Sequence, residues 1–67
     1  MTYAARIIDQ FGGYKALAAE IDKPVSTVKS WSERGIIPDW NKPAVLEAAK
    51  RRGLPISKAD FFPDKVA

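Results

Sequence analysis

The stretch from Tyr14 to Trp31 constrains the fold more than any other part of the chain. Its first half places apolar residues at the helical spacing i, i+3, i+4 and i+7, namely Tyr14, Leu17, Ala18 and Ile21. Asp22-Lys23-Pro24 then predicts a tight turn, because aspartate tolerates a positive φ and proline pre-sets φ for the first helical position. We therefore expect two short helices that this turn holds at a wide angle.

The second of these helices should have one buried side and one polar side. Val28 and Trp31 lie three residues apart, so both point to the same side of a helix over residues 25–34. The opposite side is small and polar near its start and is formed by Ser26, Ser30 and Glu33, with Lys29 on the flank. Such a surface suits the floor of a DNA groove better than a protein core.

A first helix is expected before this pair and an extended segment after it. Thr2 can cap the first helix, and Gly12-Gly13 ends it, since glycine readily takes a left-handed conformation. Gly35 should end the helix over 25–34 in the same way. Ile36-Ile37-Pro38 then predicts an extended segment that sends at least one isoleucine into the core.

The C-terminal third predicts one longer helix and one short one. Asn41 is expected to cap the longer helix, which Gly53 ends. Ser57 and Asp60 have the spacing of a capping box for a short helix that Pro63 would end. No run alternates with a period of two, so the predicted fold is all-α, with four to five short helices around a central helix-turn-helix.

Composition limits the range of functions. A chain of 67 residues is expected to form one domain over residues 1–67, and without cysteine it has neither disulfides nor thiolate metal sites. With no histidine, no glycine-rich phosphate loop and no close carboxylate pair, we expect no enzyme, cofactor, metal or small-molecule ligand. No segment has the length and apolarity of a membrane span or a leader, so we expect a cytoplasmic protein that does not bind membranes.

The net charge does not decide the partner. A formal charge of +3 and a pI near 9.5 favour a polyanion without requiring one, because many basic soluble domains have similar values. The run Lys50-Arg51-Arg52 is open to two interpretations. It complements the negative end of the helix dipole, or it contacts phosphate, and the first is the simpler.

The residues LAAEIDKPVSTVKSW, from Leu17 to Trp31, resemble the lambda-repressor-like helix-turn-helix family, more narrowly its small Cro-type phage and prophage repressors. The resemblance covers roughly residues 5–53, with Ala18 matching the small residue where the two helices cross. Two positions depart from the family pattern. Asp22 stands where glycine is usual, and Lys23 stands where an apolar residue is usual, which leaves the first residue of the reading helix open.

The resemblance implies that the helix after the turn reads bases in the major groove. The base-contacting positions would be Val25, Ser26, Lys29 and Ser30. Lys29 would favour guanine O6 and N7, and Val25 would offer a methyl surface to thymine. The alternatives are a solvated cation at Lys29 and burial under the turn at Val25.

Phosphate contacts should flank the reading helix. Tyr14 and Lys15 lie at the N-terminus of the second helix, where free N–H groups attract anions, and Asn41 and Lys42 have the same place in the fourth. Lys23 and Arg34 complete the expected set. Three roles stay open for Trp40, namely burial in the core, contact with phosphate and contact in a dimer, because its segment has no periodicity.

The resemblance further implies a homodimer on a roughly palindromic double-stranded DNA operator, acting as a repressor by occupying promoter DNA. An activator or an antitoxin-like regulator would carry the same helices. Two other functions remain open: a small protein-interaction module that uses the face of Ser26, Lys29 and Ser30, and a recombination-directionality factor that bends DNA.

Overall fold

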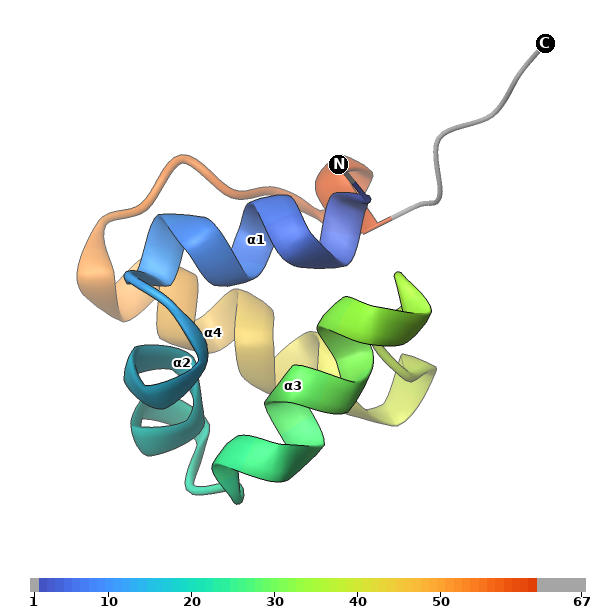
Figure 1. The fold of residues 1–67 in the computed structure, drawn as a ribbon. Coiled ribbons are helices and arrows are strands. Elements are labelled where there is room, and N and C mark those ends of the chain that lie inside the picture. Colours follow the sequence, from blue (N-terminus) through green and yellow to red (C-terminus); the bar gives the residue numbers. More distant parts are fainter. Residues whose placement is uncertain (1, 62–67) are drawn as a thin grey trace, which may run out of the picture.

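The computed structural model describes residues 2–61, and this part of the chain contains four α-helices, two short 3-10 helices and no strand (Figure 1). The elements are, in order, α1 Tyr3–Phe11, α2 Tyr14–Ile21, α3 Val25–Arg34, η1 Asp39–Asn41, α4 Lys42–Arg52 and η2 Lys58–Phe61. The predicted all-α class is therefore confirmed.

The first helix begins and ends where the sequence predicts. The Thr2 hydroxyl accepts a hydrogen bond from the backbone N–H of Ala5 at 3.2 Å, and Gly12 ends α1 in the left-handed conformation. Ile7, Ile8 and Phe11 lie on the buried side. The helix therefore packs across the remaining helices by the apolar face that its sequence defines.

The turn between α2 and α3 leads into a helix over Val25–Arg34, as predicted, but Pro24 has a different role from the one expected. Asp22 has a φ of 57°, so it does adopt the left-handed conformation, and the Lys23 N–H donates to the Ala18 carbonyl at 2.9 Å. Pro24, however, is extended, with a ψ of 145°, and α3 begins at Val25. The Pro24 carbonyl accepts a hydrogen bond from the Thr27 N–H at 3.0 Å, so Pro24 precedes the helix instead of forming its first residue.

A single apolar cluster joins all four α-helices and the second 3-10 helix, η2. Leu17 and Ala18 of α2 face Val28 and Trp31 of α3, and none of the four is more than 3% exposed. The predicted stripe of α2 is shorter than expected, because Tyr14 at its N-terminal end is 37% exposed and Ile21 only partly buried. The buried hydrophobic residues are Tyr3, Ala4, Ile7, Ile8, Phe11, Leu17, Ala18, Val28, Trp31, Ile37, Val45, Ala48, Ala49, Ile56 and Phe61.

The segment after α3 is fixed to α1. Ile37 is fully buried, which confirms that at least one of the two isoleucines enters the core, whereas Ile36 is 54% exposed. The backbone N–H of Ile37 donates to the Tyr3 hydroxyl at 2.8 Å within the core. The Ile37 N–H is buried and has no acceptor within a helix, so the bond to Tyr3 satisfies it. The bond also holds the chain between α3 and η1 in place.

The start of α4 departs from the prediction. Asn41 occupies the cap position but makes no side-chain capping hydrogen bond, because η1 runs directly into α4 and gives Asn41 a helical backbone. The predicted side-chain cap is therefore wrong, while Gly53 ends α4 as expected. The Asp60 carboxylate accepts from the Ser57 N–H at 2.8 Å before the single turn η2, and Pro63 lies outside the described residues.

Gly35 is the position where an added methyl group should cost most among the helix-ending glycines. Its φ is +74°, and a Cβ would lie 2.8 Å from Cγ2 of Thr2, whose hydroxyl caps α1. We expect Gly35→Ala to lower the free energy of unfolding by about 2–3 kcal/mol, from left-handed strain and from loss of the cap. Urea denaturation followed by circular dichroism measures this loss.

Gly53→Ala is the matched control for that substitution. Gly53 has a similar φ of +68°, but nothing lies within 4 Å of its Cβ position. The control should therefore lose only about 1 kcal/mol, from the left-handed strain alone. Equal losses in the two variants would show that Thr2 gives way without cost.

Candidate nucleic-acid interface

The outward side of α3 is open to solvent at its N-terminal end. Val25 is 39% exposed, and Ser26 and Lys29 are exposed, whereas Val28 and Trp31 behind them are buried. Ser30 is less open than expected, since it is only partly exposed. The predicted orientation of α3 is thus confirmed: its two apolar anchors point into the core and its polar side points away from the core.

This surface has the chemistry that base edges require. Ser26 offers a hydroxyl that both donates and accepts, Lys29 offers a cation, and Val25 offers two methyl groups. All three lie in the first five residues of a ten-residue helix, directly after the turn. Glu33 is also exposed, but one turn beyond Lys29, so its negative charge lies away from this end.

The N-terminus of α2 lies beside the flank of α3. Tyr14 of α2 and Ser32 of α3 line the same hollow of about 260 Å³, together with residues of α1. Gly13 precedes α2 with no side-chain capping bond, so the first turn has N–H groups that no capping side chain satisfies. Lys15 is exposed in that turn. The N-terminus of α2, where an anion site was predicted, therefore lies next to α3. The carboxylate of Asp9 in the same hollow would repel an anion.

Lys23 and Arg34 lie at opposite ends of α3. Lys23 is exposed in the turn that leads into the helix, near the outward residues just described. Arg34 is exposed in the last turn and lines a hollow of about 270 Å³ with Ile36, Pro38 and Trp40. The two cations therefore do not form one cluster.

At the start of α4, the two side chains predicted to bind phosphate are buried or contact other residues of the protein. Asn41 is only 9% exposed. Lys42 donates to Asp39, with 2.9 Å between Nζ and Oδ1, and its ammonium lies 6.0 Å from the centre of the Tyr3 ring. The hydrogen bond to Asp39 is the main reason that the pKa of Lys42 is raised above its ordinary value. These two side chains are therefore less available to phosphate than the sequence suggested.

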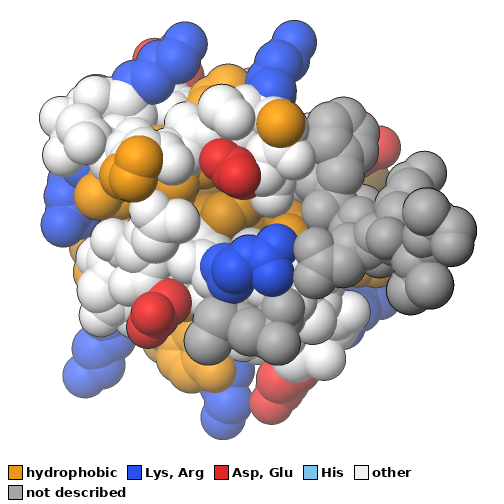
Figure 2. Space-filling model, turned by 90° about the horizontal axis from the view of Figure 1, so that it is seen from above, with side chains coloured by type: hydrophobic (Ala, Val, Ile, Leu, Met, Phe, Trp, Pro, Cys, Tyr) orange, Lys and Arg blue, Asp and Glu red, His pale blue; other side chains and the backbone are white. Residues whose placement is uncertain are grey.

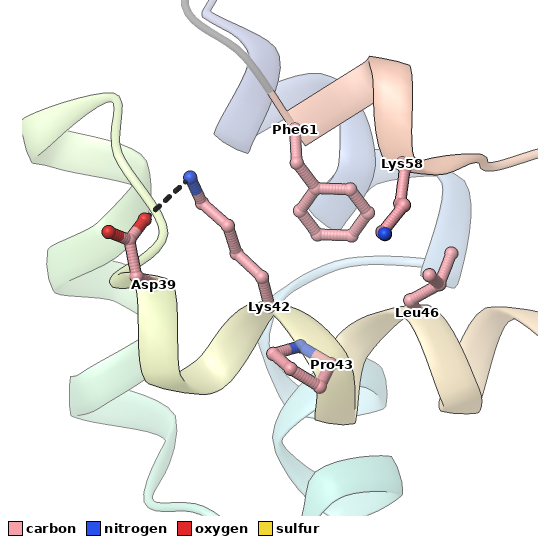
Figure 3. Close-up of a pocket in the computed structure, with 6 residues that line it drawn as sticks. All are labelled: Asp39, Lys42, Pro43, Leu46, Lys58 and Phe61. Atoms are coloured by element: carbon pink, nitrogen blue, oxygen red, sulfur yellow. Dashed lines mark ion pairs between the residues drawn. The ribbon is translucent and has the colours of Figure 1, made fainter.

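A further hollow was not predicted from the sequence. It has a volume of about 440 Å³ and lies between the start of α4 and η2, where the Phe61 ring points toward α4 between Lys42 and Lys58 (Figure 3). Pro43 and Leu46 make much of its remaining lining apolar. Within residues 2–61 no group of three or more potential metal ligands comes together.

The basic run at the end of α4 has a partner that sequence reasoning missed. Glu20 of α2 lies 3.3 Å from both Arg51 and Arg52, and Arg51 also donates to the Glu20 backbone carbonyl at 3.1 Å. Arg52 further approaches the Phe11 ring, with 6.0 Å from Cζ to the ring centre. Two of the three cations therefore connect α4 to α2, a role that neither sequence interpretation included.

On the side of the molecule that carries α1, the described residues visible in Figure 2 form no large patch of one charge. Figure 2 views this side, which is remote from the turn between α2 and α3 in Figure 1. Acidic, basic and hydrophobic side chains are interspersed over its visible part. The visible part of this side therefore has no concentrated positive charge that would attract a polyanion.

Trp40 is the most exposed large hydrophobic residue that the structure describes, at 82%. Burial in the core, one of the three roles open from the sequence, is therefore excluded. The outward positions of Trp40 and Ile36 could not be read from the sequence, because their segment has no regular spacing.

Comparison with protein-family models, with curated proteins and with solved structures gave no match. None of the helices in the described part of the chain has the length and apolarity to cross a membrane. Function therefore has to be inferred from the residues of this chain and from their arrangement.

Proposed function

We propose that this protein binds double-stranded DNA sequence-specifically, as a Cro-type transcriptional repressor of a phage or prophage. The observation that carries the proposal is that α3 has one buried apolar side and one exposed side at its N-terminal end. Val28 and Trp31 anchor the helix from behind, while Val25, Ser26 and Lys29 stand in solvent directly after a tight turn. A helix held in this way can enter the major groove with its N-terminal residues against base edges.

Lys29 is the residue that we assign to guanine, through O6 and N7. Ser26 and Ser30 contact several base types and discriminate less, and Val25 packs against a thymine methyl group. A well-formed contact of this kind is worth about 1–3 kcal/mol of discrimination against the wrong base. The partly exposed Ser30 contributes less than Ser26 in this arrangement.

Phosphate contacts hold the helix in register. Tyr14 and Lys15 at the uncapped N-terminus of α2 are the strongest candidates, because α2 begins beside α3. Lys23 follows in the adjoining turn. Lys42 and Asn41 contribute less, since their side chains are engaged or buried.

The proposed protein acts in the cytoplasm as a homodimer on a roughly palindromic operator, with half-sites about 34 Å apart. One module reads too few base pairs for useful specificity, so two copies are needed. Repression follows from occupying promoter DNA.

Selection of bound duplexes from a random library tests this proposal. We expect enrichment of a two-fold symmetric consensus with a guanine in each half-site. The absence of any enriched sequence at low salt would contradict the proposal. It would favour the alternative of a protein-interaction module, for which the charge of Lys29 is not essential.

A further inference from the structure

An exposed apolar surface lies at the C-terminal end of α3, and we call it the Trp40 patch. It consists of Ile36, Pro38 and Trp40, bordered by Arg34 and Asp39. Trp40 is 82% exposed and Ile36 54%, the two highest values among the large hydrophobic residues described. Single exposed hydrophobic residues are common, but two large ones around one hollow are typical of a binding surface.

The Trp40 patch is held in a fixed shape. Ile37, between its two apolar ends, is fully buried and donates its N–H to the Tyr3 hydroxyl. Trp40 itself lies in the 3-10 helix η1, where the Asn41 N–H donates to the Pro38 carbonyl at 2.9 Å. A rigid surface loses little conformational entropy when it binds, so the patch is prepared for a partner.

We propose that the Trp40 patch is the contact between two copies of this chain. Two opposite charges adjoin it. Arg34 lines the same hollow, and Asp39 directly precedes Trp40, with a side chain that is 90% exposed although its Oδ1 pairs with Lys42. A two-fold axis through the patch brings Arg34 of one copy near Asp39 of the other, and stacks the apolar centres. The surface carries charges of both signs, which fits the same mixed surface on a second copy better than it fits a uniformly negative polyanion.

The position of the patch also allows two copies that touch there to bind one operator together. This argument rests on the proposed function. The segment between α3 and α4 lies on the side of the molecule opposite α2, beyond the C-terminus of α3 (Figure 1). A ten-residue helix is roughly 15 Å long. Two α3 helices laid end to end would place their N-terminal turns roughly 30 Å apart, close to the half-site spacing of about 34 Å.

The small size of the patch implies weak association of the free protein. Few side chains take part, so the buried area falls at the low end for specific interfaces. Adjacent half-sites on DNA raise the effective concentration of one copy beside the other. We therefore expect a dimer that forms at high protein concentration without DNA and at much lower concentration on a palindrome.

Sedimentation without DNA tests the contact by itself. Trp40→Ala should raise the dissociation constant of the dimer at least tenfold while circular dichroism stays unchanged. Arg34→Asp and Asp39→Arg should each weaken the dimer, because each places like charges across the axis, and the double variant should restore it. A wild-type chain that stays monomeric up to millimolar concentration, or single and double charge variants that behave alike, would overturn the contact.

A second arm uses the selected palindrome and a duplex with a single half-site. Trp40→Ala should bind the half-site as the wild type does and lose the cooperative gain on the palindrome. Equal weakening on both duplexes would overturn the proposal and assign Trp40 to DNA. If no duplex is selected but Trp40→Ala and the charge variants still control sedimentation, the DNA-binding function fails and the contact between copies stands.

Discussion

Replacing Lys15 and Lys29 together by glutamate is expected to reduce affinity for the selected duplex by at least about a hundredfold. Lys29 is proposed to contact a base and Lys15 a phosphate, and loss of each contact is worth about 1.4 kcal/mol or more, a factor of ten. The introduced carboxylates also repel the phosphate backbone. Titration of a labelled duplex at fixed salt measures the effect, and the salt slope should fall with it.

The matched control reverses two lysines outside the proposed interface. Lys50, in the last turn of α4, and Lys58, in η2, are both exposed, so Lys50→Glu with Lys58→Glu changes the net charge by the same amount. Because distant charges are screened within about 10 Å at moderate salt, we expect less than a tenfold loss. Equal losses in the two double variants would mean that overall charge, and not the face of α3, retains DNA.

Removing the Trp31 side chain is expected to remove a large part of the free energy of unfolding. Trp31 is 3% exposed at the centre of the cluster that joins α3 to the other helices, and a buried tryptophan replaced by alanine loses about 3–5 kcal/mol. A domain of this length has a total stability of roughly 3–10 kcal/mol. Urea denaturation followed by circular dichroism at 25 °C should show that Trp31→Ala unfolds at a much lower urea concentration than the wild type.

Trp40→Ala is the control for this loss, because it removes the same side chain from an 82% exposed position. Measured at low concentration, where the chain is monomeric, it should change the free energy of unfolding by no more than about 0.5 kcal/mol. If Trp31→Ala unfolded at the same urea concentration as Trp40→Ala, the tryptophan behind α3 would not anchor the reading helix.

Local chemistry made several helix boundaries predictable. Glycine in the left-handed conformation ends α1, α3 and α4 at Gly12, Gly35 and Gly53, because few other residues adopt this backbone without strain. Asp22 takes the same conformation at the turn. The buried side of α3 was likewise readable, since Val28 and Trp31 have helical spacing and no competing apolar face exists.

Contacts between distant residues were not predictable. Glu20 meets Arg51 and Arg52 across more than thirty residues of sequence, only because α2 and α4 pack together. Asn41 is the last residue of the 3-10 helix η1, so its backbone is already helical and its side chain does not cap α4. The DNA contacts assigned to Lys15 and Lys29 stay predictions, since they depend on a partner.

Methylation interference on the selected duplex tests most directly whether α3 reads the major groove. Methylation of guanine N7 adds a group to the major-groove edge, whereas methylation of adenine N3 adds one to the minor-groove edge. With α3 in the major groove, N7 methylation at the guanine of each half-site should abolish binding of the wild type. Methylation of adenine N3 within the half-sites should leave binding intact. Interference from adenine N3 alone, or from neither position, would contradict the placement of Ser26 and Lys29 against base edges.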